Sequence, residues 1–431
     1  MPIRLDHRNP DFTERFAAFL SMKREVSRDI DAAARAIVED VAARGDVALI
    51  EATAKYDRLT LNAQTLRVSA DEIAAATAVC DPKTVDALKL ARNRIETYHR
   101  RQLPKDERFT DALGVELGWR WSAVDAAGLY VPGGTAAYPS SVLMNAVPAK
   151  VAGVERVVMV VPSPDGKLNP LVLAAASLAG ITEVYRVGGA QAVAALAYGT
   201  ATIKPVAKIV GPGNAYVAAA KRIVFGKVGI DMIAGPSEVL VMADHTGNAD
   251  WIAADLLAQA EHDVNAQSIL LTDDEELAAN VERSIESQLS TLPREAIARP
   301  SWNDFGAIIL VRSMEEALPL ADAIAAEHLE IMTEDSEALA ARVHNAGAIF
   351  IGPHTPEAIG DYVGGSNHVL PTARSARFSS ALGVLDFMKR TSILKCGPDQ
   401  LRALGPAAMT LGIAEGLDAH ARSVGLRLNL R

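Results

Sequence analysis

Hydrophobic residues recur at the α-helical period through most of the first hundred positions. The apolar positions of the first such stretch are Ile30, Ala33, Ala34, Ile37 and Val41. They follow the i, i+3, i+4, i+7 spacing of one helix face, so we expect a helix from Ser27 to Gly45 and a second one through Tyr56. The capping box Ser69-Ala-Asp-Glu72 starts a third helix, and Asp81-Pro82 places proline in the first turn of a fourth.

The period changes to two residues near position 115. Val115, Leu117, Trp119 and Trp121 alternate with polar or small residues, which predicts a strand or hairpin. Short β-branched runs then alternate with helical stretches, at 156–161, 183–187, 208–210, 238–242, 268–272, 306–311 and 347–351. Such alternation is typical of βαβ units, so we expect two parallel α/β sheets. After Ser379 the pattern predicts only loop and helix.

Length and composition set the class of protein. A chain of 431 residues exceeds the roughly 250–300 residues at which a single core stops growing, so more than one domain is expected. The net charge of −10 disfavours nucleic-acid binding. The sequence has no run of the ~18–20 apolar residues that cross a bilayer, and its first residues lack the apolar region of a signal peptide, so we expect no membrane insertion and a cytoplasmic protein. Cys80 and Cys396 lack the spacing of a disulfide framework or a thiolate zinc site.

Glycine-rich turns follow two of the predicted strands. Val187-Gly-Gly-Ala-Gln191 and Val210-Gly-Pro-Gly-Asn214 both open helices, and the amides of a helix N-terminus suit a phosphate-bearing ligand. Tyr216 stands where a dinucleotide fingerprint has glycine, so neither turn completes that motif. The alternative is structural, because any tight strand-to-helix turn favours glycine. In another turn-rich segment, Ser140 and Ser141 can cap a helix through 142–147.

Residues capable of metal binding and proton transfer gather in the second half of the chain. Gln259 and His262 lie three residues apart at the end of a predicted helix, which puts both on one face, although polar residues also collect where a helix frays. Glu327 and His328 are adjacent bases of different pKa, suited to activating water and to accepting an alcohol proton; the alternative is an exposed Glu beside a partly buried His.

Further candidates lie beyond this pair. Asp361 and His368 lie in a glycine-rich segment without helical period, predicted as a loop, and Glu415 and His420 end a helical pattern. Two imidazoles, a carboxylate and an amide oxygen, from Gln259, His262, Asp361 and His420, suit Zn²⁺ or a similar divalent ion.

A set of motifs in a fixed order makes the chain resemble the histidinol dehydrogenase family over nearly its whole length. The motifs are Gly128-Leu-Tyr-Val-Pro-Gly-Gly134, Val187-Gly-Gly-Ala-Gln191, Gly211-Pro-Gly-Asn214, Gly235-Pro-Ser-Glu-Val239, Gln259-Ala-Glu-His262, Glu327-His328, Asn367-His-Val-Leu-Pro-Thr372 and Glu415-Gly-Leu-Asp-Ala-His420. The resemblance implies oxidation of L-histidinol through L-histidinal to L-histidine, the last steps of histidine biosynthesis, with NAD⁺ reduced twice.

The resemblance also implies a role for each site residue. Gln259, His262, Asp361 and His420 match the zinc ligands, and Glu327 and His328 match the catalytic bases. The positions that match substrate contacts are Ser237, Gln259, His262, His328, Asp361, His368, Glu415 and His420. Those that match NAD contacts are Tyr130, Gln191 and Asn214.

The fold implied by the resemblance consists of two incomplete Rossmann-like, aldehyde-dehydrogenase-like α/β domains, with small terminal segments that wrap around the partner in a homodimer. We expect an N-terminal arm at 1–25, where the sequence is polar and weakly periodic, a larger α/β domain at 26–129 with 239–381, an NAD-binding α/β domain at 130–238 and a C-terminal tail at 382–431. In such a dimer Glu415 and His420 complete the partner's active site. The alternatives are a zinc- and NAD-dependent dehydrogenase of another polar alcohol, and a metal- or nucleotide-binding protein without catalysis.

Overall fold

The computed structural model describes residues 1–22, 28–133, 138–233 and 235–430. The chain forms two compact units, one of Met1–Gln102 with Asp125–Phe387 and one of Leu103–Val124 with Met388–Arg431. The first unit contains a six-stranded and a five-stranded sheet, which confirms the expectation of two parallel α/β sheets. The domain limits expected from the sequence stay a prediction. Among the described residues, no helix has both the length and the apolar character needed to cross a bilayer.

The four expected N-terminal helices are present. They are α2 (Arg28–Arg44), α3 (Asp46–Tyr56), α4 (Ala70–Ala78) and α5 (Pro82–Arg100). The capping box of α4 is complete, because Ser69 Oγ accepts from the Glu72 amide over 3.1 Å and the Glu72 carboxylate accepts from the Ser69 amide over 2.9 Å. Ser27, where we expect α2 to begin, and Gly134 of the glycine-rich motif lie outside the described residues.

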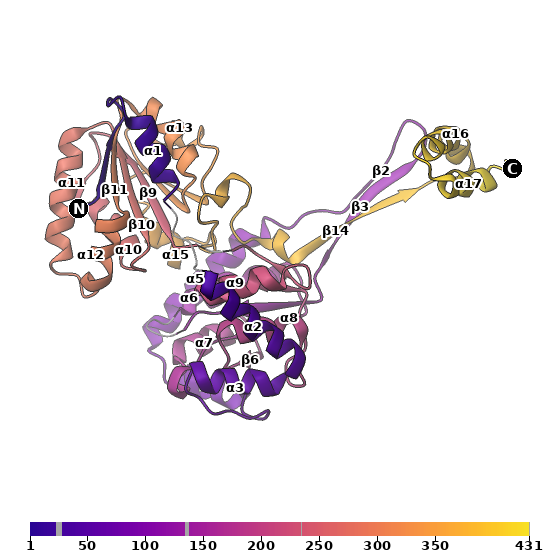
Figure 1. The fold of residues 1–431 in the computed structure, drawn as a ribbon, viewed down its shortest axis with the longest axis horizontal. Coiled ribbons are helices and arrows are strands. Elements are labelled where there is room, and N and C mark those ends of the chain that lie inside the picture. The colour runs from indigo at the N-terminus through magenta and orange to yellow at the C-terminus, as the bar shows by residue number, and fades with distance from the viewer. Residues whose placement is uncertain (23–27, 134–137, 234, 431) are drawn as a thin grey trace. The chain divides into compact units, whose positions relative to one another are not determined.

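The six-stranded sheet is entirely parallel, in the order β1-β11-β10-β9-β12-β13. Its strands are β1 (Ile3–Asp6), β9 (Glu238–Ala243), β10 (Gln267–Thr272), β11 (Ala307–Leu310), β12 (His328–Met332) and β13 (Ala348–Ile351). One face packs on α10 (Ala249–Ala260), α11 (Glu275–Leu289) and α12 (Glu295–Phe305), and the other on α1 (Phe12–Leu20), α13 (Met314–Ile324) and α14 (Ser336–Ala340) (Figure 1). Val239 and Val241 face the first set and Leu240 and Met242 the second, so this sheet is buried on both faces.

Part of the segment expected as an N-terminal arm belongs to the core. β1 is the edge strand beside β11, with Ile3 opposite Ala307, and Phe12, Phe16 and Phe19 of α1 are buried against the sheet. Three aromatic residues at helical spacing carry this packing, although the residues that precede α1 are mostly polar. The prediction of an arm is therefore wrong for residues 3–20.

The five-stranded sheet is also parallel, in the order β6-β5-β4-β7-β8. Its elements are β4 (Ala126–Tyr130), α6 (Pro139–Val151), β5 (Arg156–Val160), α7 (Pro170–Leu178), β6 (Glu183–Tyr185), α8 (Gly189–Tyr198), β7 (Lys208–Val210), α9 (Ala215–Val224) and β8 (Gly229–Ile230). The helices α2, α3, α8 and α9 share one apolar cluster with it. The predicted serine cap of α6 is wrong, because Tyr138 is the N-cap and Ser140 and Ser141 lie buried in the first turn.

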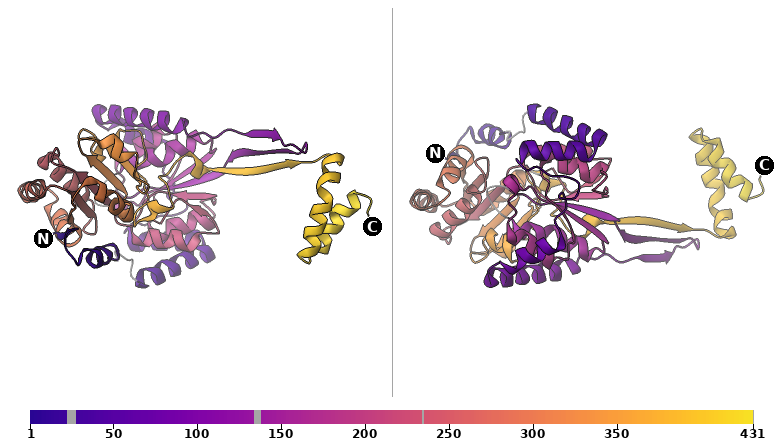
Figure 2. Two further views of the ribbon diagram at one scale, coloured as in Figure 1. Left: turned by 90° about the horizontal axis from the view of Figure 1, so that it is seen from above. Right: turned by 90° about the horizontal axis from the view of Figure 1, so that it is seen from below.

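The second unit contains a three-stranded antiparallel sheet and two helices. The strands are β2 (Glu107–Thr110), β3 (Glu116–Ala123) and β14 (Met388–Lys395), in the order β14-β3-β2, followed by α16 (Pro398–Ala414) and α17 (Asp418–Arg427). Figure 2 shows the three strands side by side, with β14 leading to the C-terminal helices. The hairpin expected near 115 is confirmed. The prediction of only loop and helix after Ser379 is wrong for β14, which pairs with β3. Its residues are mostly exposed, so it lacks the apolar alternation that marks a strand.

Candidate active site

Glu327 and His328 are both held by the main chain of one residue, Glu238, at the start of β9. The Glu238 amide donates to Glu327 Oε2 over 3.0 Å, and its carbonyl oxygen accepts from His328 Nδ1 over 3.0 Å. The contacts arise because β12, which begins with His328, pairs in parallel with β9. Since a carbonyl only accepts, Nδ1 carries a proton, and in the neutral ring Nε2 is the atom that can accept another. His328 Nε2 is buried, has no hydrogen-bond partner among the described residues, and lies 3.6 Å from Asp361 Oδ1.

Carboxylates surround the imidazole of His328. Its Nδ1 lies 3.7 Å from Glu357 Oε2 and 3.8 Å from Glu327 Oε2. Burial alone disfavours the imidazolium, but the charges of Glu357, Glu327 and Asp361 outweigh it and hold the pKa of His328 well above its usual value. Burial raises the pKa of Glu327 to about 7 and that of Glu357 to about 8. The cluster therefore combines a strong base with carboxyl groups that exchange protons near neutral pH.

A second pair of acids lies behind His328. Glu330 shares one face of β12 with His328, and its Oε1 accepts from the Glu357 amide over 2.6 Å. Asp255, on α10, interacts with Glu330, and burial raises the pKa of Asp255 to about 6. Burial, followed by the charges of Asp255 and Glu357, raises the pKa of Glu330 well above its usual value. Sequence reasoning missed these acids, although a glutamate two residues after His328 in an apolar strand is a readable signal.

Three of the predicted metal ligands approach the same cluster. Gln259 is in the last turn of α10 and His262 follows that helix, with the Gln259 amide nitrogen 3.2 Å from His262 Nδ1. Gln259 Oε1 is buried and has no hydrogen-bond partner among the described residues. Such an orphaned oxygen beside an imidazole fits a group that contributes to a metal site. Burial lowers the pKa of His262, opposed by the charge of Asp361.

Asp361 lies on a helix, so the prediction of a loop at this position is wrong. It belongs to α15 (Glu357–Tyr362), six residues long and too short for its helical period to be visible. Burial raises the pKa of Asp361, but the nearby imidazole of His328 and the charges of His368 and His262 outweigh burial and lower it overall. Asp361 is therefore an ionised carboxylate among three imidazoles.

His368 connects Asp361 with the five-stranded sheet. Its Nδ1 donates to the Asp361 carbonyl over 3.0 Å, and its Nε2 lies 3.2 Å from Ser141 Oγ on α6. Because Nδ1 carries the proton, Nε2 accepts from the serine hydroxyl. Ser141, predicted only as a cap, thus fixes the ring of a predicted substrate-binding residue. Burial lowers the pKa of His368, which keeps the ring neutral.

The remaining predicted substrate contacts lie elsewhere. Ser237 is half-buried just before β9, where its carbonyl accepts from the Gln267 amide over 2.9 Å. Glu415, at the end of α16, and His420, in the first turn of α17, belong to the second unit, and both are exposed there. Across the described ranges, no three His, Cys, Asp or Glu side chains are close enough together to hold a metal ion.

The predicted NAD contacts follow strands of the five-stranded sheet. Tyr130 ends β4, and its buried hydroxyl accepts from the Gly189 amide over 3.0 Å; burial raises the pKa of this phenol to about 12. Gln191 is buried in the first turn of α8. Asn214 caps α9 by accepting from the amides of Tyr216 and Val217 over 3.1 and 3.2 Å. The two glycine turns therefore do open helices, as predicted.

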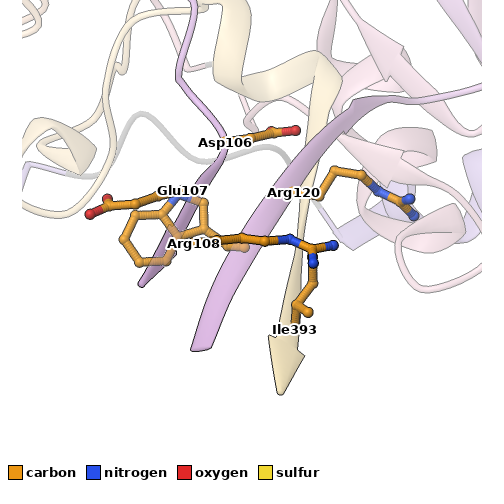
Figure 3. Close-up of a pocket in the computed structure, with 6 residues that line it drawn as sticks. Asp106, Glu107, Arg108, Arg120 and Ile393 are labelled. Carbon is orange, nitrogen blue, oxygen red and sulfur yellow. The ribbon is translucent and has the colours of Figure 1, made fainter. Parts of the chain in front are cut away.

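The second unit carries a groove of its own. It is lined by Asp106, Glu107, Arg108, Trp119, Arg120 and Ile393. Figure 3 shows the charged side chains around it on the three-stranded sheet. None of the predicted site residues lines this groove, so it gives no support to any of the predicted roles.

Comparison with known proteins agrees with the motifs. The chain matches the family described as histidinol dehydrogenase over residues 20–428. It is 80% identical over 430 residues to the histidinol dehydrogenase of Bradyrhizobium diazoefficiens and 81% identical over 429 residues to that of Nitrobacter winogradskyi, with 100% of each chain covered in both cases. A crystal structure of histidinol dehydrogenase from Elizabethkingia anophelis superposes with a TM-score of 0.94 at 35% identity, covering 99% of this chain and 98% of that one. The chain belongs to the histidinol dehydrogenase family.

Proposed function

We propose that this protein oxidises L-histidinol through L-histidinal to L-histidine, using two molecules of NAD⁺ per substrate, in the last steps of histidine biosynthesis. The observation that carries the proposal is the Glu327–His328 pair, fixed by the Glu238 main chain and facing Asp361. The family relationship supplies the substrate. A protein that only binds a metal or nucleotide has no need for two bases of this kind.

The first oxidation removes two electrons from the alcohol. His328 Nε2 accepts the hydroxyl proton while the hydride on the same carbon leaves for NAD⁺, giving the aldehyde, NADH and one proton. In its neutral form His328 suits this task, because its Nδ1–H donates to the Glu238 carbonyl and its Nε2 has no other partner among the described residues. The surrounding carboxylates stabilise the imidazolium that forms.

The second oxidation begins with water. Glu327 takes a proton from a water molecule as the oxygen attacks the aldehyde carbon, and the resulting hydrate loses its hydride to the second NAD⁺ to give the acid, NADH and a proton. A carboxyl group with a pKa of about 7 can both accept and release this proton at physiological pH. Attack by water needs no cysteine nucleophile, and Cys80 and Cys396 are not among the site residues.

The donor set also suits one zinc ion for each subunit. Gln259, with its unpaired buried oxygen, His262, Asp361 and His420 would hold the ion. When bound, zinc would orient the substrate and polarise it electrostatically. Ser237, His368 and Glu415 would contact the substrate beside these ligands. For NAD, we propose contacts with Tyr130, Gln191 and Asn214, next to the helix N-termini of α8 and α9.

We further propose a homodimer in which Glu415 and His420 complete the active site of the partner subunit. Apolar side chains on the C-terminal helices support this, since Leu411 and Leu426 are 63% and 62% exposed in the single chain. A cytoplasmic location remains a prediction from the sequence.

One assay tests the proposal. The purified protein is given L-histidinol and NAD⁺, and NADH formed per histidinol consumed is counted before and after treatment with a chelator. We expect two NADH per histidinol, with activity lost on chelation and restored by Zn²⁺. No NADH from histidinol would refute the proposal, and activity confined to another alcohol would favour a related dehydrogenase.

A further inference from the structure

A buried ion pair lies behind the turn that carries Asn214. Lys221 is on α9 and Asp231 follows β8, and their side chains are only 2% and 1% exposed. Their charged groups are in direct contact. Removing two charges from water is costly, and an apolar pair of similar volume is often equally stable or better. The pair therefore calls for an explanation beyond packing.

The two side chains bind both polar main-chain groups of Gly211. Asp231 Oδ2 accepts from the Gly211 amide over 2.7 Å, and Lys221 Nζ donates to the Gly211 carbonyl over 3.0 Å. Asp231 Oδ1 also accepts from the Met232 amide over 2.7 Å. An apolar pair would leave the amide and the carbonyl of Gly211 without these partners, which is a large penalty for buried groups.

Gly211 needs this support because its backbone is unusual and closely packed. Its φ of +110° is a conformation that other residues rarely adopt, and a Cβ at this position would lie 2.1 Å from the Tyr130 carbonyl oxygen. The ion pair thus holds Gly211 against the main chain of Tyr130. Three residues later, Asn214 caps α9. Lys221 and Asp231 therefore fix the position of Asn214 relative to Tyr130.

We infer that Lys221 and Asp231 are positioning residues for the dinucleotide: the buried pair holds the Gly211–Asn214 turn in the shape that binds NAD, without touching the cofactor. This inference rests on the proposed function, in which Tyr130 and Asn214 contact NAD. It predicts that the pair controls cofactor affinity separately from histidinol affinity, because the bases that act on histidinol lie on the six-stranded sheet and its neighbouring loop.

The test compares the full-length protein with Lys221→Met, Asp231→Asn and the double variant. The Kd for NADH is measured by fluorescence titration, and the KM values for NAD⁺ and histidinol by steady-state kinetics. Unfolding curves show which variants are folded. The double variant covers the case in which Lys221→Met fails to fold, because it leaves no unpaired charge in the interior.

Arg156→Met is the matched control. Arg156, at the start of β5, pairs with Glu183, at the start of β6, over 2.8 Å, whereas Gly211 follows the end of β7 in the same sheet. Arg156 also donates to the carbonyls of Pro205 and Lys204. It therefore loses an ion pair and carbonyl contacts like those of Lys221, but far along the strands from the Gly211 turn.

We expect the Kd for NADH and the KM for NAD⁺ to rise about tenfold or more in the folded pair variants, with the KM for histidinol and the control nearly unchanged. Equal NADH affinity in wild type and every folded pair variant would overturn this inference and leave the proposed function intact. An equal loss of NADH affinity in Arg156→Met would overturn it too, since the effect would then reflect general stability. Wild-type protein that binds no NADH would refute the proposed function and this inference with it.

Discussion

Glu238 holds Glu327 through its main-chain amide, which donates to Glu327 Oε2 over 3.0 Å. This bond orients the carboxyl group and leaves Glu327 Oε1 outside the contact. Replacement of Glu327 by glutamine keeps an acceptor for the Glu238 amide but removes the proton-accepting group. We can therefore separate the chemical role of Glu327 from its structural role.

For Glu327→Gln we expect normal folding and loss of the second oxidation. The overall kcat should fall about 100-fold or more, the usual range for a lost general base. Because His328 is unchanged, rapid-quench experiments should show histidinal accumulating with about one NADH per histidinol. The control is Glu337→Gln, an exposed glutamate on α14, which should match wild type. A Glu327→Gln variant that still yields two NADH at the wild-type rate would contradict the assigned role.

Asp255 beside Glu330 should make stability depend on pH. Burial raises the pKa of Asp255 from 3.8 to about 6, so the unfolded chain loses this proton at lower pH than the folded protein does. The free energy of unfolding therefore falls as pH rises from about 4 to about 6 and stays lowered above that.

We expect Asp255→Asn to remove this fall. The shift of about two pKa units corresponds to about 3 kcal/mol at most. Because Asp255 is partly exposed, we expect the free energy of unfolding of Asp255→Asn to exceed that of wild type by about 1–2 kcal/mol at pH 8 and to differ little at pH 4. Urea unfolding with a chelator present measures it. The exposed Asp86, paired with Lys89, is the control: Asp86→Asn should shift stability by less than about 0.5 kcal/mol at either pH. A gain for Asp255→Asn that is equal at both pH values would exclude the buried acid as its cause.

We expect the Gln259 side chain to lower the stability of the metal-free protein and to raise its affinity for Zn²⁺. Its buried Oε1 has no hydrogen-bond partner among the described residues, which costs the metal-free protein free energy. Without metal, we expect the free energy of unfolding of Gln259→Met to equal that of wild type or to exceed it by up to about 1 kcal/mol. We expect the variant to bind Zn²⁺ at least about tenfold more weakly.

Gln267 provides the comparison for Gln259. It is also buried, but its Nε2 donates to the Phe305 carbonyl over 3.2 Å. Gln267→Met should lose about 1 kcal/mol of stability with its zinc affinity intact. Isothermal titration with Zn²⁺ and urea unfolding measure both quantities. If Gln259→Met lost stability as Gln267→Met does and kept its zinc affinity, Gln259 would be an ordinary buried amide.

The features that could be predicted from the sequence are those that depend on neighbouring residues only. The Ser69–Glu72 capping box is contained within four residues, and the structure has it. The parallel sheets were readable because strands such as Glu238–Ala243 are buried on both faces and leave apolar runs. β14 left no such run, because its side chains are mostly exposed and only pairing with β3 makes it a strand.

The candidate site shows the same limit. Glu327-His328 was visible as a pair of neighbours, whereas the Glu238 main chain that orients both is 89 and 90 residues away. Glu357, 3.7 Å from His328, is brought there by a six-residue helix too short to be recognised. Long-range contacts of this kind depend on strand register, which the sequence alone does not specify at the level of one residue.

Asp361 and His420 allow a test of the shared active site. In the proposed dimer each site takes Asp361 from one subunit and His420 from the other. Chains carrying Asp361→Ala and chains carrying His420→Ala should each be inactive, since each lacks a zinc ligand in both sites. In a mixed dimer, one site contains both substitutions and the other contains neither. Random reassociation at equal amounts should therefore restore about a quarter of the wild-type activity.

The measurement is histidinol-dependent NADH formation after the two variants are unfolded together, refolded with Zn²⁺, and compared with each variant refolded alone. Size-exclusion chromatography with light scattering verifies that dimers have formed. A second control mixes two differently tagged preparations of His420→Ala, in which every site lacks the same ligand and no activity should return. If the mixed dimers form but stay inactive, His420 acts within its own subunit, and the proposed exchange of C-terminal helices between sites is wrong.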